Sequence, residues 1–148
     1  MKLIVTKFGG TSVGTIDRIK SVAKRIKNEV NNGYNVIVVV SAMAGETNRL
    51  IKLVESLTND YRTSEYDTVI SSGEQVTSGL LAIALNELGI KSKSYQGWQI
   101  PFETDNNFSK ANIKEIKKDK ISFDLNDGYV IVVPGFQGVH NNRITTLG

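Results

Sequence analysis

Two apolar runs without alternation constrain the fold of this chain more than any other feature. Residues 36–40 and 129–133 each contain five hydrophobic residues in a row. A strand with one face in water alternates apolar and polar side chains, whereas an unbroken apolar run indicates a strand that is covered on both faces. Such strands are typical of parallel sheets that carry helices on both sides. Residues 3–5 form a shorter apolar segment, which we interpret as the first strand of the same sheet.

Helical patterns lie between these strands. In residues 15–32 the apolar side chains recur at helical spacing, Thr15 is suited to cap the helix, and Gly33 is suited to end it. Further helices are expected at residues 48–59, at residues 66–88 with a break at residues 71–74, and at residues 121–126. Short strands are expected at residues 91–95 and 111–116, and a loop at residues 96–107. This alternation predicts a single α/β domain over residues 1–148, a three-layer αβα sandwich with a mainly parallel sheet.

The turn after the first strand combines a lysine, two glycines and two hydroxyl groups. Lys7 is followed by Gly9 and Gly10, which let the backbone turn sharply and approach an anion closely, and then by Thr11 and Ser12. Backbone N–H groups at the start of the next helix add partial positive charge. The arrangement is typical of phosphate binding, and a turn that needs glycine for its shape alone is the alternative. It is not a Walker A loop, because the lysine precedes the glycines, and it lacks the third glycine of the dinucleotide fingerprint.

Polar groups also follow the other apolar strands, at the edge where parallel sheets bind their ligands. Residues 41–47 are small and polar, and Thr47 is either the N-cap of the next helix or a hydroxyl group for a ligand. Residues 134–138 carry two glycines behind the last apolar run. Glu74 lies at an apolar helix start, where it either complements the helix dipole, an effect of at most about 1 kcal/mol, or faces a ligand cation.

The composition disfavours several classes of function. The chain has no cysteine and a single histidine, His140, so disulfides, metal sites built on these residues and histidine-based triads are not expected. The formal charge of +3 is small and most lysines are scattered, which disfavours a nucleic-acid partner. The longest apolar run is far too short to span a bilayer and no signal peptide is visible, so we expect a cytoplasmic protein without a membrane partner.

Residues 7–13, which read Lys-Phe-Gly-Gly-Thr-Ser-Val, resemble the opening signature of the aspartate kinases, members of the amino-acid kinase family. Residues 41–47, 71–75 and 145–148 resemble later segments of these enzymes, so the resemblance extends along the chain to its last residue. It implies an amino-acid kinase-like fold and transfer of the γ-phosphoryl group of Mg-ATP to the β-carboxylate of L-aspartate. The product, 4-phospho-L-aspartate, would be the first intermediate in the biosynthesis of lysine, threonine and methionine.

The resemblance also implies a role for each candidate residue. Lys7 is expected to be catalytic and to neutralise charge on the transferred phosphoryl group. ATP phosphates are expected to bind Lys7, Gly9, Gly10, Thr11 and Ser12. L-Aspartate is expected to bind Ser41, Thr47 and Glu74, with Glu74 facing its α-ammonium group. The implied cofactors are ATP and Mg²⁺; the ion would be held mainly by phosphates and water, so no metal-ligating residue is assigned.

The signature that begins at residues 145–148 continues in aspartate kinases with Arg-Gly-Gly-Ser-Asp. We therefore expect a truncated kinase domain, the aspartate-binding part without the C-terminal nucleotide part and the ACT regulatory domains, and expect it to be inactive alone. Self-association is expected through residues 80–85, which are apolar nearly all round, and residues 130–133. Two alternatives stay open: a free-standing module that binds aspartate or another anion, and a related kinase that acts on another carboxylate or on carbamate.

Overall fold

A parallel sheet forms the centre of the structure, a computed structural model that describes residues 2–148. Its strands are, in spatial order, β1 (Lys2–Phe8), β2 (Tyr34–Val40), β6 (Val130–Pro134) and β3 (Ser92–Ser94). Lys7 pairs with Val39, and Val39 pairs with Val133. The carboxyl ends of β1, β2 and β6 therefore lie level with one another, and the loops that follow them leave the sheet side by side.

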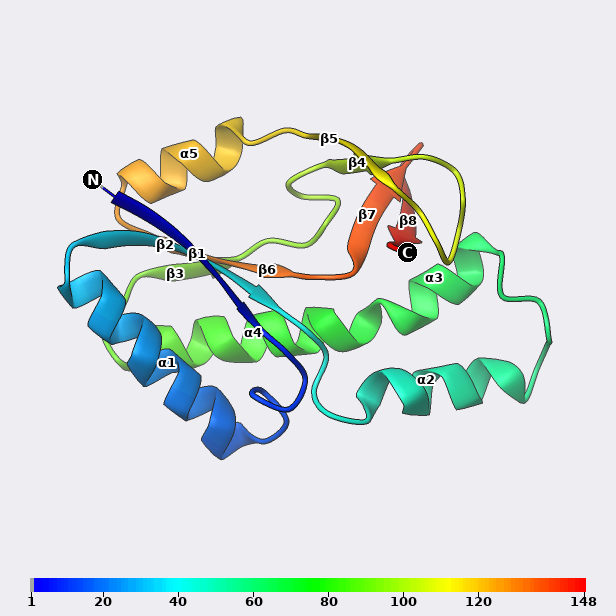
Figure 1. Cartoon of the computed structure of the whole chain (residues 1–148), viewed down its shortest axis with the longest axis horizontal. Helices are drawn as coiled ribbons and strands as arrows, with labels where there is room; N and C mark the ends of the chain where they lie inside the picture. The colour runs from blue at the N-terminus through cyan, green and yellow to red at the C-terminus, as the bar shows by residue number, and fades with distance from the viewer. Residues whose placement is uncertain (1) are drawn as a thin grey trace.

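Helices cover both faces of this sheet (Figure 1). The helices α1 (Ile16–Asn31) and α4 (Ser72–Glu87) pack on one face, and the shorter α5 (Asp119–Asn126) packs on the other against β6. The helices α2 (Glu46–Glu55) and α3 (Ser64–Ile70) lie beyond the carboxyl ends of the strands. The three-layer α/β sandwich with a parallel central sheet, which the sequence predicted, is confirmed.

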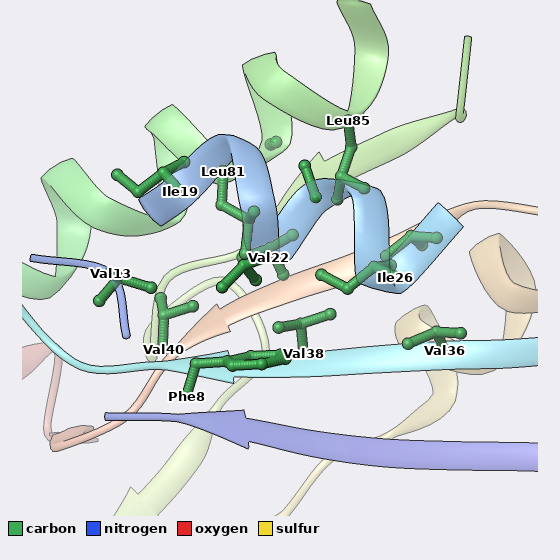
Figure 2. Packing of buried hydrophobic residues seen from close by; sticks show 14 residues of the cluster. Phe8, Val13, Ile19, Val22, Ile26, Val36, Val38, Val40, Leu81 and Leu85 are labelled. Atoms are coloured by element: carbon green, nitrogen blue, oxygen red, sulfur yellow. The ribbon is translucent and has the colours of Figure 1, made fainter. Parts of the chain in front are cut away.

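The larger hydrophobic core lies between the sheet and the helices α1 and α4. Figure 2 shows Val22 and Ile26 of α1 and Leu81 of α4 above Val38 of β2. This cluster contains 14 buried residues, against 6 in the cluster on the α5 side. Burying one large aliphatic side chain stabilises a fold by about 1.5–3 kcal/mol, so the α1–α4 layer contributes the larger share.

The two apolar runs differ in how completely they are covered. All of β6 is buried, as its unbroken run predicted. In β2 alternate residues from Val36 onwards are buried, whereas Ile37 and Val39 on the opposite face are only half-buried. The prediction of two-sided burial for residues 36–40 is therefore correct for one face only, because the short α5 packs against β6 and leaves its neighbours less covered.

One of the two surfaces predicted for self-association is wrong. Because β6 lies inside the sheet between β2 and β3, residues 130–133 offer no free surface. In α4, Leu81 and Leu85 are buried but Ile83 is 60% exposed, so residues 80–85 keep apolar surface open and self-association through them stays a prediction. The open apolar surface of the sheet lies on the edge strand β1, where Leu3 and Val5 are 53% and 62% exposed.

The helix limits follow local chemistry. α1 has its predicted limits, because the Thr15 hydroxyl accepts a hydrogen bond from the Arg18 amide (3.2 Å) and Gly33 follows with φ +87°. α2 begins two residues before the predicted start and ends at Glu55, before the exposed Leu57. α4 begins at Ser72, directly after α3, so the predicted break is a single residue, Ser71.

A second sheet lies beside the carboxyl end of the first and was not predicted. Its spatial order is β5 (Ile113–Ile116), β4 (Phe102–Thr104), β7 (Gln137–His140) and β8 (Arg143–Thr146). β4 is parallel to β7, and the other pairs are antiparallel. The expectation of a plain loop at residues 96–107 is wrong, because β4 lies within it. Asn141 and Asn142 form the β7–β8 turn with φ +46° and +60°, the conformation for which asparagine is favoured in two-residue hairpin turns.

No helix within residues 2–148 combines the length and the apolar character that crossing a bilayer requires.

Candidate active site at the carboxyl ends of the strands

The first loop turns at Gly9 and presses against the loop that follows β2. The Ser12 amide donates to the Gly9 carbonyl (3.0 Å) and closes the turn. A Cβ atom on Gly10 would lie 2.9 Å from the Ala42 carbonyl oxygen, so the close approach of the two loops requires glycine there. A Cβ atom on Gly9 would meet nothing within 4 Å. Packing therefore explains Gly10, while the space beside Gly9 is open to a ligand.

Backbone hydrogen bonds hold three strand ends together. The Ser41 amide donates to the Phe8 carbonyl (3.1 Å), and the Gly135 amide donates to the Val40 carbonyl (2.8 Å). The loops after β1, β2 and β6 consequently start from one rigid edge. This is the edge at which the sequence predicted ligand binding.

A cavity of about 260 Å³ opens between the first two loops and the start of α4. It is lined by Gly10, Ser41, Ala42, Met43, Ala44, Gly45, Thr47, Asn48 and Glu74. The structure thus brings together Gly10 and all three residues that were predicted to bind aspartate. Residues 42–45 lie in the segment that the sequence singled out but had no individual role assigned, and Asn48 lies one residue beyond that segment.

Glu74 supplies the cavity with a buried carboxylate. Its side chain is 4% exposed, and Oε1 accepts a hydrogen bond from the Ala42 amide (3.2 Å). Oε2 is buried and has no hydrogen-bond partner among the described residues. Burial raises the pKa of the Glu74 carboxyl, and hydrogen bonds from its own amide and from the Ala42 amide oppose this rise. A buried acceptor without a partner costs about 1–3 kcal/mol or more when charged, and a ligand cation would offset that cost.

Thr47 does not cap α2. The N-cap is Gly45, which has φ +82° and makes no side-chain capping bond, and Thr47 lies inside the first helical turn. The N-cap interpretation is therefore wrong, because the left-handed Gly45 starts the helix two residues earlier. The half-buried Thr47 side chain lies on the cavity wall instead.

Lys7 and Ser12 lie on a second, neighbouring groove. This groove has a volume of about 610 Å³ and runs between β1 and α1, with Arg18 and Arg25 along its length. The Arg18 guanidinium donates to the Thr11 carbonyl (2.7 Å) and so ties α1 to the glycine turn. The groove carries three cationic side chains against one carboxylate, that of Glu29, and such an imbalance attracts anions.

The structure therefore separates the predicted phosphate-binding residues. Lys7 and Ser12 face the β1–α1 groove, Gly10 borders the cavity beside Glu74, and Gly9 and Thr11 line neither. The two arginines were missed by sequence reasoning. Their spacing of seven residues, two helical turns on the exposed face of α1, was a readable signal that both point to one side of the helix.

Within residues 2–148 no three side chains of histidine, aspartate or glutamate gather closely enough to hold a metal ion.

Comparison with known proteins identifies relatives of this chain in sequence and in structure. The sequence model of the Amino acid kinase family matches residues 2–148. The aspartokinase of Rickettsia felis is 52% identical over the whole chain, which covers 38% of that protein. The aspartate kinase of Synechocystis has 38% identity and a TM-score of 0.80, and the chain covers 24% of it.

A more distant structure, E. coli aspartokinase III in complex with aspartate and ADP, has 22% identity and a TM-score of 0.81 and shows the same fold. The chain covers 44% of that protein and thus spans less than half the length of each of these three relatives. The match to the family model nevertheless extends over every described residue. The chain belongs to the amino acid kinase family.

Proposed function

We propose that this chain is the acceptor-binding part of an aspartate kinase, an enzyme that transfers the γ-phosphoryl group of ATP to the β-carboxylate of L-aspartate. The observation that carries the proposal is the buried, unpartnered Oε2 of Glu74 at the wall of the cavity. An α-ammonium group is the ligand that such an oxygen fits. The names of the homologous aspartokinases favour aspartate over another carboxylate or carbamate as the acceptor.

In this proposal the cavity orients aspartate by its amino group. Glu74 binds the α-ammonium group, and Ser41 and Thr47, which also line the cavity, supply hydroxyl groups. The amino group is then fixed at the α4 side, and the side-chain carboxylate is directed towards Gly10, the one glycine-turn residue on the cavity wall. A bound cation also stabilises the ionised form of Glu74, because each charge offsets the desolvation of the other.

The glycine turn and Lys7 serve the transferred phosphoryl group. Phosphoryl transfer needs positioning and charge stabilisation more than covalent chemistry. Backbone N–H groups of Gly9 and Gly10, the hydroxyls of Thr11 and Ser12, and the ammonium of Lys7 would supply that stabilisation. Mg²⁺ would arrive with ATP as part of the substrate, held by phosphates and water.

Binding of L-aspartate tests the proposal without requiring turnover. Calorimetric titration of the 148-residue chain should detect binding, and Glu74→Gln should weaken it by about 10- to 100-fold, the loss of one charge-assisted contact. Glu46→Gln is the matched control, because Glu46 lies nearby on α2 and is paired with Arg49 (2.8 Å). Equal loss of affinity in both variants, or no binding by the unmodified chain, would contradict the assignment of the cavity.

A further inference from the structure

A buried glutamine from the second sheet reaches the helix junction in front of the cavity. Gln137, on β7, is 2% exposed, and both ends of its amide are used. Its Nε2 donates to the Ser71 carbonyl (2.7 Å), and its Oε1 accepts from the Gly97 amide (3.1 Å). A Cβ atom on Gly97 would lie 2.9 Å from the Gln137 Cβ, so the Gly97 backbone packs directly against the base of the glutamine side chain.

Ser71 joins α3 to α4 and gives α4 no side-chain cap. It ends α3 and begins α4, with helical φ −73° and ψ −13°, and its side chain makes no capping bond to α4. The Ser71 amide donates to the Asp67 carbonyl of α3 (3.1 Å), whereas the Ser71 carbonyl accepts from Gln137, so the second sheet adds a contact at the point where α4 begins. The junction precedes Glu74 by less than one helical turn.

The start of α4 is also packed tightly against the cavity loop. A Cβ atom on Gly73 would lie 2.8 Å from the Ala42 Cβ, and the Ala42 amide is the donor to Glu74. A shift of Ser71 would thus move α4 against the loop or away from it. Either movement changes the contact between Ala42 and Glu74.

A second buried contact fixes the preceding helix to the same hairpin. Asp67, one turn before Ser71, is fully buried and accepts hydrogen bonds from the Thr146 amide and hydroxyl (both 2.8 Å) and from the Ser109 amide (3.0 Å). Figure 1 shows α3 beside β7 and β8. The β7–β8 hairpin therefore contacts α3 through Asp67 and the α3–α4 junction at Ser71 through Gln137.

From this geometry we propose that Gln137 is a positioning residue for Glu74. Its amide holds the Ser71 carbonyl and thereby sets where α4 begins, and this fixes the carboxylate in the cavity wall. The proposal rests on the aspartate cavity described above for its functional meaning, but the positioning itself is a property of the unliganded chain. It assigns to the second sheet, which contributes no residue to the cavity, control over the geometry of the acceptor site.

The test compares two glutamine variants in the 148-residue chain. Gln137→Met keeps the length of the side chain and removes both hydrogen bonds, and Gln96→Met is the matched control. Gln96 is another buried glutamine that contacts α4, through a bond from its Nε2 to the Ser78 hydroxyl (3.1 Å), one turn beyond Glu74. Nuclear magnetic resonance would measure the Ala42 amide shift and the pKa of the Glu74 carboxyl in each protein.

We expect Gln137→Met to move the Ala42 amide signal upfield and to lower the pKa of Glu74 towards its ordinary value, as the carboxylate becomes more exposed. Glu46, the nearest other carboxylate, is paired with Arg49 and should not confuse the titration. Gln96→Met should lower the melting temperature and leave both signals in place. Unchanged Ala42 and Glu74 signals in a folded but less stable Gln137→Met protein would overturn the proposal.

A second variant, Gln137→Glu, provides the test if Gln137→Met does not fold. Gln137→Glu keeps the size of the side chain and an acceptor for the Gly97 amide, and it loses the donor to the Ser71 carbonyl when ionised. The Ala42 amide shift and the pKa of Glu74, measured on this variant, then decide the question.

Titration with L-aspartate tests the positioning by Gln137 and the proposed ligand separately. If Gln137→Met weakens binding by about fivefold or more, the positioning affects the acceptor site. Shifted Ala42 and Glu74 signals without aspartate binding by the unmodified chain would uphold the positioning and overturn the proposed ligand.

Discussion

Gly10 and Ala42 approach each other so closely that a single added methyl group on Gly10 would lie 2.9 Å from the Ala42 carbonyl oxygen. This contact joins the glycine turn to the wall of the cavity beside Glu74, since both residues line it. The relative position of the two loops therefore depends on a missing side chain.

The first prediction concerns the two glycines. Gly10→Ala should lower the free energy of unfolding by about 1–3 kcal/mol, because the obstructing atom belongs to the backbone and cannot rotate away. Gly9→Ala is the matched control and should leave stability nearly unchanged, because its Cβ would meet nothing within 4 Å. Denaturant titration of both variants measures the difference. Equal stability of the two would mean that the loops are not in contact.

The second prediction concerns Lys7 in an active enzyme that contains this chain. Lys7→Ala should lower kcat by about 100-fold or more and change KM for aspartate much less, because its charge acts on the transferred phosphoryl group. Lys2→Ala, at the other end of the same exposed strand, should leave both constants unchanged. Steady-state kinetics would refute the assignment by showing near-normal kcat in the Lys7 variant.

The third prediction concerns pH. Burial raises the pKa of Glu74 in the folded chain, so the stability that its protonated form contributes is present below the unfolded pKa and is lost as pH rises through the folded pKa. Glu74→Gln should therefore gain stability relative to the unmodified chain as pH rises from about 4.5 to neutrality. Melting temperatures of both proteins across this range provide the measurement. Parallel curves would show that Glu74 is not desolvated.

The fourth prediction concerns the buried carboxylate of Asp67. Asp67→Ala should lower the free energy of unfolding by about 3 kcal/mol or more, because it leaves the amides of Thr146 and Ser109 without their acceptor. Asp127→Ala removes only an exposed ion pair with Lys91 (3.4 Å) and should cost about 0–1 kcal/mol. Chemical denaturation of the two variants, side by side, gives the comparison.

The fifth prediction concerns self-association, for which the edge strand β1 is a further surface beside residues 80–85. The exposed edge strand β1, with Leu3 and Val5, is a surface on which a second chain could pair. Sedimentation at micromolar concentration should detect species larger than a monomer, and the double variant Leu3→Lys, Val5→Lys should reduce them. Leu53→Lys, at an equally exposed position on α2, should not. A monomeric unmodified chain would end this idea.

The parts of the fold that the sequence predicted are those with strong local patterns. The unbroken apolar run at residues 129–133 and the helix cap at Thr15 depend only on residues that are neighbours in the sequence. The strands of the central sheet and the limits of α1 could therefore be predicted. The second sheet could not, because β4 has three residues and is parallel to β7, a strand more than thirty residues away in the chain. Strands this short carry too little pattern to separate them from a loop.

The candidate site likewise contains residues that the sequence predicted and residues that it missed. Lys7 and Glu74 stand in recognisable segments, and the structure places both at the carboxyl ends of the strands. Thr47 had two interpretations: the helix cap is wrong, because a glycine in the left-handed conformation took the cap position, and binding of aspartate stays a prediction for a residue on the cavity wall. Gln137 acts through a contact with a residue far away in the chain, which no local pattern reveals. The missed Arg18 bonds to Thr11 only seven residues away, and its spacing from Arg25 was readable in the sequence.

The hydrogen bonds between the β7–β8 hairpin and the helices α3 and α4 affect the order in which parts of the protein fold. The bonds from Gln137 to Ser71 and from Thr146 to Asp67 close chain loops of 66 and 79 residues. Closing long loops is entropically costly and slow, and neither bond can form until the ribosome has released the hairpin. The helix that bears Glu74 can thus form early during translation, whereas the cavity beside Glu74 reaches its final shape only when nearly all of these residues have been synthesised.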